Sequence, residues 1–200
     1  MSLIKLLKKW NKRKESHEEY IKYQIYRAEK TERIFKKISK GRSLIDIGSH
    51  RGGYSIAFAK MGYDVTGIDI DESKLQTARE MSRSQGLDIL FEKGDAMNIP
   101  FGDNSFDIAI SSNIIEHLSD SEAHLGECHR ILRRGGLLYL QFPPYWGILG
   151  AHVYAKGIPL PFQYLPFGLA NWLIKRLNLF SELDEIGKVT ISSVMNKAKK

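Results

Sequence analysis

The sequence predicts an α/β fold with a doubly wound, mostly parallel sheet, and three observations support this prediction. Two short apolar runs, at 44–47 and 65–70, flank a segment of helical character that reaches Lys60. A loop with Gly48, Gly52 and Gly53 joins the first run to this segment. Asp69 stands near the end of the second run. A strand, a glycine loop, a helix, a second strand and an acid in this order are typical of half of a nucleotide-binding sheet.

Each part of this stretch has a physical role beside a nucleotide. Gly48 lets the backbone turn sharply where a side chain would collide with a ligand. The amides after it stand at a helix N-terminus, which attracts a carboxylate or a phosphate. Asp69 lies 17 residues after Gly52, close to the spacing of about 20 at which an acid accepts hydrogen bonds from ribose hydroxyls. An ordinary strand–helix turn without a ligand is the alternative for this segment.

The glycine spacing separates two classes of cofactor. The segment from Gly48 to Gly53 does not read G-x-G-x-x-G, as a dinucleotide site would. Asp46, Gly48 and Gly52 are instead similar to motif I, D-x-G-x-G-x-G, of the class I S-adenosylmethionine-dependent methyltransferases. His50 departs from the motif, since it takes the place of the middle glycine. The resemblance implies S-adenosylmethionine as the cofactor and a Rossmann-like sheet with strand order 3-2-1-4-5.

The N-terminal 40 residues are expected to form a helical cap. Residues 1–14 contain six lysines and arginines and no acid, while the whole chain carries +7. The rest is nearly neutral, which argues against a broad surface for nucleic acid. Residues 1–14 also place four apolar side chains (Leu3, Leu6, Leu7 and Trp10) on one helical face. This face is predicted to contact either the protein's own core or, as a peripheral contact, an anionic membrane surface.

The segment 16–40 reads as one helix, because Tyr20, Tyr23, Tyr26 and Ile34 recur at near-helical spacing. These side chains are interpreted as core packing. In the family that the sequence resembles, a helix here covers the mouth of the cofactor site, so they are also candidates for lid contacts.

The alternation of strands and helices continues after Asp71. Ser73 is expected to cap a helix that runs to Gln85, and a short third strand follows at 89–91. A fourth strand is expected at 108–110 and a fifth at 137–142. A helix between them is expected to close at a basic-Gly-Gly turn at 133–136. His124 and His129 are interpreted as exposed residues of this helix.

The segments 99–107 and 111–118 are the most family-specific part of the chain. They are similar to the type 11 branch, which includes quinone-biosynthesis methyltransferases and enzymes that act on small metabolites, lipids and saccharides. This resemblance assigns Asp95 and Ala96 to the adenine and Ser111, Ser112 and Asn113 to the methionine end of the cofactor. We expect these and the first loop to bind the cofactor, which gives the full set Asp46, Gly48, Ser49, His50, Gly52, Asp69, Ile70, Asp95, Ala96, Ser111, Ser112 and Asn113.

His117 is a candidate general base, since an unperturbed imidazole is largely neutral at pH 7. Two alternatives stay open, in which Glu116 and His117 brace their loop or contribute to a divalent metal site. Similar enzymes bind such a metal through two glutamates and the histidine. Asn113 stands where the first glutamate would be, so a hard cation would lose a charged ligand and no metal is predicted.

Residues 143–200 are rich in aromatic residues and proline at their start, and they resemble the acceptor lid of type 11 enzymes. His152 in this segment is a second candidate base or substrate contact. No two strand-like runs remain for a sixth and seventh strand, so these are predicted to be weak or missing. The predicted organisation is therefore a cap at 1–40, a cofactor-binding core at 41–142 and a lid with C-terminal helices at 143–200.

The predicted function is transfer of a methyl group from S-adenosylmethionine to a small-molecule, lipid or saccharide acceptor. A non-catalytic protein that binds this cofactor or its demethylated product and a membrane-surface interaction protein are the alternatives. Cys128 is the only cysteine and no apolar run is long enough to span a membrane, so a cytoplasmic protein is expected. The oligomeric state and the acceptor atom are not encoded in any motif of the chain.

Overall fold

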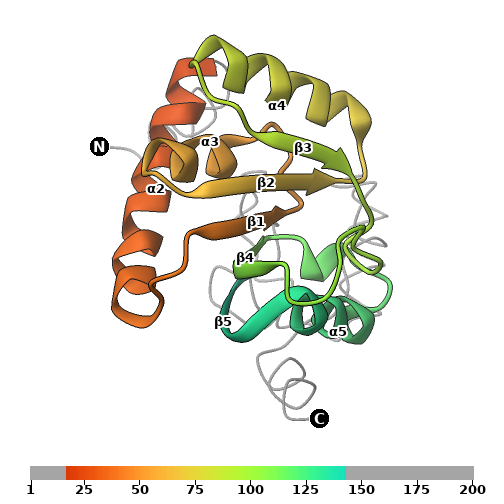
Figure 1. Ribbon diagram of the computed structural model, residues 1–200. Coiled ribbons are helices and arrows are strands. Elements are labelled where there is room, and N and C mark those ends of the chain that lie inside the picture. Colours follow the sequence, from red (N-terminus) through yellow and green to blue (C-terminus); the bar gives the residue numbers. More distant parts are fainter. Residues whose placement is uncertain (1–16, 143–200) are drawn as a thin grey trace, which may run out of the picture. The chain divides into compact units, whose positions relative to one another are not determined.

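The computed structural model describes residues 17–142, and side chains of this range only where their placement is fixed. The chain alternates between helices and strands in the predicted order (Figure 1). The helices are α2 (His17–Ile38), α3 (Gly53–Lys60), α4 (Glu72–Ser84), the short 3-10 turn η1 (Ile115–His117) and α5 (Ser121–Ile131). The strands are β1 (Ser43–Ile47), β2 (Asp64–Asp69), β3 (Leu90–Lys93), β4 (Phe106–Ser112) and β5 (Leu132–Gln141).

The five strands form one sheet with the order β3-β2-β1-β4-β5, as predicted. β1 is parallel to β2 on one side and to β4 on the other, and β2 is parallel to β3. β1 is central and almost completely buried, because Leu44, Ile45 and Ile47 carry apolar side chains toward both faces of the sheet. A central parallel strand is covered on both faces, which explains why apolar side chains point toward both of them.

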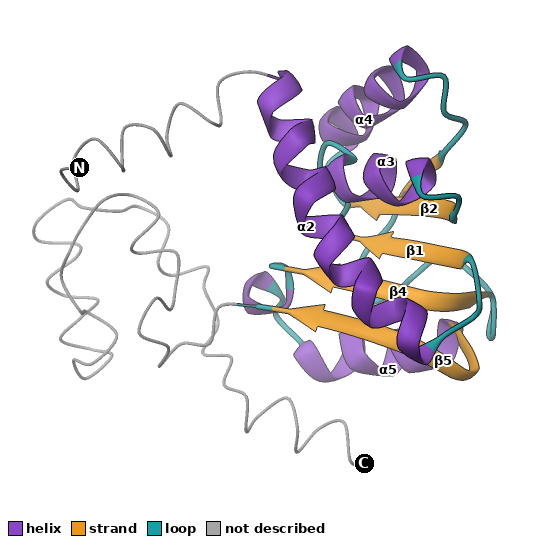
Figure 2. Ribbon diagram, turned by 90° about the vertical axis from the view of Figure 1, so that its left-hand side faces the viewer, coloured by secondary structure: helices purple, strands orange, loops and turns teal. Residues whose placement is uncertain are grey.

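Helices α2 and α3 pack on each other and lie in front of the strands in Figure 2. α2 faces the core through a stripe of buried residues at helical spacing, namely Ile21, Gln24, Ala28, Thr31 and Phe35. The Phe35 ring stacks on Phe58 of α3, with ring centroids 5.5 Å apart, and Phe58 meets Tyr63 edge to face at 5.3 Å. An aromatic cluster therefore fixes α2 against α3.

The chain divides into two compact units, which are described separately. Among the described residues, 17–112 and 126–140 belong to the first unit, and 113–125 and 141–142 belong to the second. The domain boundaries predicted at 40 and 142 stay a prediction. The predicted weak or missing sixth and seventh strands, the lid at 143–200 and the apolar face of residues 1–14 lie outside the described residues.

Three local predictions were wrong. Asp71, not Ser73, caps α4, because its carboxylate accepts hydrogen bonds from the amide and the hydroxyl of Ser73 at 3.0 and 2.6 Å. The basic-Gly-Gly segment at 133–136 is part of β5 and not a turn before it. Gly135 has φ 79°, and a Cβ on Gly136 would lie 2.8 Å from the carbonyl oxygen of Arg133, so the glycines permit a local distortion within the strand.

The third wrong prediction concerns the helix pattern of α2. Tyr23, Tyr26 and Ile34 are exposed, while the buried stripe combines Ile21 and Phe35 with the small or polar residues Gln24, Ala28 and Thr31. Within residues 17–142, none of the helices combines the length and the apolar composition that a membrane span requires.

Candidate cofactor and active site

The carboxyl ends of the central strands meet at one edge of the sheet. The register pairs Ile47 at the end of β1 with Ile68 of β2 and with Ser111 of β4. Asp69 at the end of β2 pairs with Lys93 of β3. The glycine loop, Asp69 and Ser111 therefore leave their strands at the same level, which is where ligands bind in open parallel sheets.

The loop between β1 and α3 is built from residues in the left-handed region of the backbone. Gly48, His50 and Gly52 have φ values of 74°, 52° and 73°. The amides of Gly48 and Ser49 both donate to the carbonyl oxygen of Ile68, at 2.9 and 2.8 Å, so the loop is fastened to β2 at its start. The loop is thus a defined turn that brings main-chain groups to the carboxyl edge.

Phe91 closes the space beneath this loop. A Cβ on Gly52 would lie 2.9 Å from the Phe91 ring and 2.9 Å from the Cβ of Ala78, and a Cβ on Gly67 would lie 2.6 Å from the same ring. Gly52 and Gly67 are therefore required by packing as well as by the turn. This requirement belongs to the protein's own core and not to a ligand.

His50 holds the conformation that a glycine would hold in the motif. Its φ of 52° lies in the left-handed region, which non-glycine residues adopt at some cost. Its imidazole is exposed. Partial loss of hydration lowers the pKa of His50, and Lys74 and Arg51 act in the same direction. The side chain is thus directed to the protein surface while the main chain keeps the course of the loop.

Asp69 is held in place by two main-chain amides. The amide of His50 donates to Oδ2 at 2.9 Å, and the amide of Asp71 donates to Oδ1 at 3.0 Å. The residue is 8% exposed. Each carboxylate oxygen can accept a further hydrogen bond, so the group is oriented in advance and can still receive two vicinal hydroxyls.

Asp46 is the acid of the first motif and lies beneath the loop. It is 3% exposed and accepts a hydrogen bond of 2.6 Å from the Ser55 hydroxyl of α3. Burial raises the pKa of Asp46 to about 6, although the bonds from Ser55 and the charge of Arg27 act against this rise. The motif acid thus fastens β1 to α3, and Ser55 is a partner that the sequence analysis missed.

Arg27 of α2 is a second residue that the sequence analysis missed. Its guanidinium donates to the Ser112 hydroxyl at the end of β4 at 3.1 Å and to Gln24 Oε1 at 3.3 Å. Its Cζ lies 4.8 Å from the centroid of the Tyr54 ring. An arginine more than 80 residues away in sequence therefore reaches the carboxyl edge, where its charge also influences Asp46.

The edge after β2 and β3 offers apolar and polar groups together. Ile70, which follows Asp69 directly, is 68% exposed. Asp95 follows β3, and its Oδ1 accepts a hydrogen bond of 2.8 Å from the amide of Met97 in a tight turn that includes Ala96. The predicted adenine residues thus stand in a defined turn at the expected edge of the sheet.

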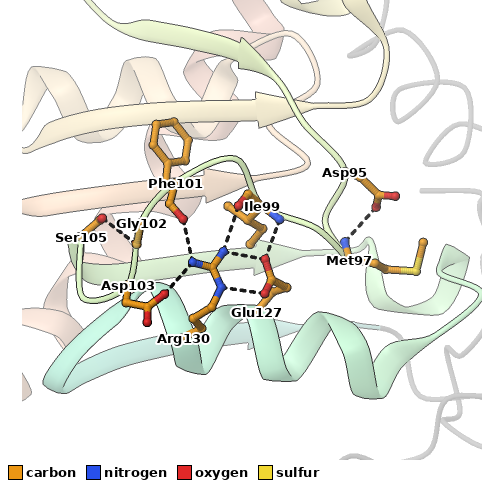
Figure 3. Close-up of polar contacts among 9 residues, drawn as sticks. All are labelled: Asp95, Met97, Ile99, Phe101, Gly102, Asp103, Ser105, Glu127 and Arg130. Atoms are coloured by element: carbon orange, nitrogen blue, oxygen red, sulfur yellow. Dashed lines mark hydrogen bonds and ion pairs between the residues drawn. The ribbon is translucent and has the colours of Figure 1, made fainter.

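A charged clamp holds the segment after this turn (Figure 3). Arg130 of α5 bonds both carboxylate oxygens of Glu127 at 2.7 Å and donates to the carbonyl oxygens of Ile99 and Phe101 at 2.9 and 2.7 Å. Glu127 accepts the amide of Ile99 at 2.7 Å. These bonds lower the pKa of Glu127 and raise that of Arg130. The clamp therefore holds the segment that follows the turn at Asp95.

The Ser49 hydroxyl is a buried polar group at the centre of the loop. The residue is 5% exposed, and its Oγ has no hydrogen-bond partner within the described part of the chain. Buried hydroxyls in proteins are usually hydrogen-bonded. An unsatisfied hydroxyl in the glycine loop is a group that a polar ligand at this edge would satisfy.

The predicted catalytic residues fall partly in the second unit. Asn113 has φ 56° and its amide donates to the carbonyl oxygen of Gln141 at 2.7 Å. His117 ends η1 with its side chain 45% exposed, and its Nε2 lies 3.9 Å from Oε1 of the buried Glu116. His152 lies outside the described residues.

His124 is completely buried, so the prediction of an exposed His124 was wrong, whereas His129 is exposed. No group of three or more metal-binding side chains occurs in residues 17–142.

The sequence of this region matches known methyltransferases. Residues 45–140 match the type 11 family model, which is described as a methyltransferase domain. The chain is 33% identical over 102 residues to the ubiquinone biosynthesis O-methyltransferase of Caulobacter vibrioides, an alignment that covers 50% of this chain and 40% of the relative. It is 33% identical over 105 residues to the ajmaline N-methyltransferase of Rauvolfia serpentina, with 50% and 36% covered.

Through residues 45–140, the chain is similar to the type 11 methyltransferase family.

Solved structures agree with this similarity. The methyltransferase domain is similar to a SAM-dependent methyltransferase from Methanosarcina mazei with 30% identity and a TM-score of 0.52, over 56% of this chain and 58% of the other. The PH0226 protein from Pyrococcus horikoshii shares the fold, with 23% identity and a TM-score of 0.60 over 87% of this chain and 79% of the other. The chain spans about two fifths of the length of the curated relatives it matches.

The residues of the methyltransferase domain fit the cofactor of this family, S-adenosylmethionine. The pre-oriented Asp69 carboxylate suits a ribose, and the exposed Ile70 beside it suits a flat apolar base. The buried Ser49 hydroxyl in the loop suits a polar ligand group. These three observations are independent of the sequence match.

Proposed function

We propose that this domain transfers a methyl group from S-adenosylmethionine to a small-molecule, lipid or saccharide acceptor. The observation that carries the proposal is the Asp69 carboxylate, which two main-chain amides orient at the carboxyl edge beside the glycine loop. The bound sulfonium supplies a methyl group that reacts directly with an acceptor nucleophile. The sulfur keeps the electron pair of the broken bond, and the acceptor releases a proton where it carries one.

In this proposal Asp69 accepts hydrogen bonds from both ribose hydroxyls. The carboxylate is already oriented before the cofactor arrives, so little side-chain freedom is lost on binding. Ile70 covers one face of the adenine, and the turn at Asp95 and Ala96 receives its exocyclic amine. Asp95 Oδ1 accepts a hydrogen bond from the amide of Met97, and this bond orients the carboxylate. The second carboxylate oxygen of Asp95 is the proposed acceptor for the adenine amine.

Arg27 and the glycine loop hold the amino-acid end of the cofactor. The guanidinium lies beside Ser112 and over the Tyr54 ring, at the end of β4. A carboxylate there would form a charge-assisted hydrogen bond, which is stronger than a bond between neutral groups. Asp46 and the residues Gly48, Ser49, His50 and Gly52 fix the loop. Ser111 and Ser112 contact the methionine end, and the same role is proposed for Asn113, which follows them in sequence.

The rate would come mainly from positioning the two reactants and from excluding water. His117 is the described candidate for accepting the acceptor's proton, and His152 is the second candidate. A phenol or carbon acid needs less help from a base than an alcohol does. The relatives are named O- and N-methyltransferases, so oxygen and nitrogen acceptors both suit this family. The buried thiol of Cys128 suits a cytoplasmic enzyme.

The test combines calorimetry with a methyl-transfer assay. We expect S-adenosylmethionine and S-adenosylhomocysteine to bind, NAD not to bind, and radiolabelled methyl to appear in one class of a small-molecule acceptor panel. Loss of turnover in His117→Ala with unchanged binding of S-adenosylhomocysteine would support His117 as the base, with His129→Ala as the matched control. A chain that binds neither nucleoside contradicts the proposal.

A second candidate is a cofactor-binding protein that does not transfer methyl groups. One similar structure, with 27% identity and a TM-score of 0.51, is that of the cyclase SpnF, so the fold also serves a protein named for another reaction. Binding of S-adenosylhomocysteine without methyl transfer to any acceptor in the panel would favour this candidate.

A further inference from the structure

The outward face of α2 carries a strip of basic and apolar side chains. At 100° per residue, its members fall within an arc of about 120° opposite the buried stripe of this helix. We call this face the basic strip, and its residues are Lys22, Tyr23, Tyr26, Lys30, Arg33, Ile34 and Lys37. In Figure 2, α2 is the element in front of the sheet, so this face points away from the strands.

The apolar members of the basic strip are unusually accessible for their size. Tyr26 is 53% exposed, Tyr23 42% and Ile34 48%, and Ile38 at the margin of the strip is 65% exposed. These are four of the six large hydrophobic side chains found exposed in the described part of the chain. Single exposed apolar residues are common on protein surfaces, but a set of four on one helix face marks an interaction surface.

The charge of the strip identifies the kind of partner. Four of the seven residues of the strip are basic, namely Lys22, Lys30, Arg33 and Lys37. Lys30 lies over the Tyr26 ring at 4.4 Å, which keeps its ammonium group beside the apolar surface. Glu19 is the one acidic residue within the arc of the strip. A second copy of the chain would present the same positive charge and would be repelled.

We propose that the basic strip docks the protein on an anionic lipid surface, with α2 lying in the plane of the headgroups. Tyrosine and isoleucine would enter the interface, while the lysines and Arg33 contact lipid phosphates. Aliphatic side chains at the edge of the strip favour a lipid surface over nucleic acid, because Ile34 and Ile38 have no partner on a phosphodiester backbone. The inference does not depend on the reaction that the domain catalyses.

The docking also has a geometric consequence for the chain itself. Arg27 leaves α2 beside Tyr23 and Tyr26 and reaches Ser112 at the carboxyl edge. The same two turns of α2 therefore carry both the lipid-facing tyrosines and Arg27, which contacts the candidate site. Docking would bring this end of the sheet close to the membrane surface.

Vesicle co-sedimentation of the full chain tests the proposal. We expect binding to vesicles that contain phosphatidylglycerol and none to phosphatidylcholine vesicles. The triple variant Lys30→Glu, Arg33→Glu, Lys37→Glu should bind at least about tenfold more weakly, since each basic residue near an anionic surface contributes to affinity. A matched triple variant, Lys60→Glu, Arg83→Glu, Arg134→Glu, changes the net charge equally at exposed sites elsewhere and should retain binding within about threefold.

Two further variants separate the contributions within the N-terminal part. The double variant Tyr26→Ser, Ile34→Ser leaves the charge unchanged and should also weaken binding to anionic vesicles. Thermal unfolding followed by circular dichroism is the control for folding, and the triple variants and the double variant should unfold at the wild-type temperature. Four outcomes would overturn the proposal: no binding to anionic vesicles, equal losses in the two triple variants, loss of binding only in Lys5→Glu, Lys8→Glu, Lys9→Glu, or displacement of the protein from vesicles by duplex DNA or RNA.

Discussion

Asp69 accepts a hydrogen bond of 2.9 Å from the main-chain amide of His50, so the end of β2 and the loop after β1 are fixed to each other. The acid that would bind the ribose and the loop that would bind the methionine end thus form one rigid edge. The amide belongs to the residue that departs from the motif. His50 therefore contributes through its backbone, and the glycine that it replaces is not needed for this contact.

Replacement of Asp69 by asparagine should weaken binding of S-adenosylhomocysteine by about 10- to 100-fold, because a charged acceptor for two hydroxyls is lost. Isothermal titration calorimetry measures the effect. Asp64→Asn is the matched control, since Asp64 begins the same strand at the opposite edge and is exposed. Equal affinities of the wild type and Asp69→Asn would show that the carboxylate does not touch the cofactor.

Replacement of Arg27 by methionine should reduce affinity for S-adenosylhomocysteine by about tenfold or more, because a charge-assisted hydrogen bond to the carboxylate is removed. Binding of 5′-methylthioadenosine, which lacks the amino-acid part, should be unchanged. This pair of ligands locates the effect at one end of the cofactor. Arg33→Met, on the exposed face of the same helix, is the control, and an equal loss for both ligands would argue for a purely structural role.

Replacement of Asp46 by asparagine should increase stability at neutral pH. The pKa of Asp46 is raised to about 6, so the unfolded chain loses this proton first as the pH rises from about 4. The native state therefore loses stability between about pH 4 and pH 6, and the cost is complete above that window. We expect the variant to gain about 1–3 kcal/mol in the free energy of unfolding near pH 7, and this gain should vanish toward pH 4.

Asp71→Asn is the control with the opposite sign. The hydrogen bond from Ser73 lowers the pKa of Asp71 to about 2, so its contribution is present above about pH 4 and is lost as the pH falls toward 2. Urea unfolding across this pH range compares the two variants. Stability curves that run parallel for wild type and Asp46→Asn would contradict the burial argument.

Replacement of Gly52 by alanine should cost more stability than replacement of Gly62. Both residues have positive φ, 73° and 84°, so both variants bear a backbone cost of about 1 kcal/mol. Only at Gly52 would the new Cβ lie 2.9 Å from Phe91 and Ala78, while nothing lies within 4 Å at Gly62. We expect a further loss of about 1–3 kcal/mol in urea unfolding for Gly52→Ala. Equal losses would mean that the core below the loop relaxes freely.

Replacement of Arg130 by methionine should destabilise the protein by about 1–3 kcal/mol, because Glu127 and two carbonyl oxygens lose their donors. Arg130→Lys should restore little, since an ammonium cannot bond both Glu127 oxygens and two carbonyls in one plane. Arg83→Met, at the exposed end of α4, serves as the control in the same denaturation experiment. Faster amide exchange at Met97 and Ile99 in the Arg130 variant would link the clamp to the turn at Asp95.

The sheet and its loop were predictable because local chemistry specifies them. Buried parallel strands appear as apolar runs, and residues in the left-handed region favour glycine, so β1, β2 and the intervening turn could be located from the residues alone. The order of the strands was implied by the resemblance to class I methyltransferases, and the observed order confirms it. The placement of Asp69 at the carboxyl edge followed from both.

The contacts made by Arg27 and Ser55 could not be predicted, because they depend on how α2 and α3 pack against the sheet. The helix α2 shows the same difficulty. Three of the five residues in its buried stripe, Gln24, Ala28 and Thr31, are small or polar, so hydrophobic periodicity selected the tyrosines on the opposite face. The pairing of Glu127 with Arg130 was detectable, since residues three apart on a helix are neighbours.

The ring of Phe91 fills the volume that side chains at positions 52 and 67 would otherwise occupy. Substitutions at these three positions, which lie on separate elements, are therefore coupled to one another. Among descendants of this protein, a larger residue at position 67 can persist only where position 91 has already become smaller, so the order in which such exchanges accumulate is constrained.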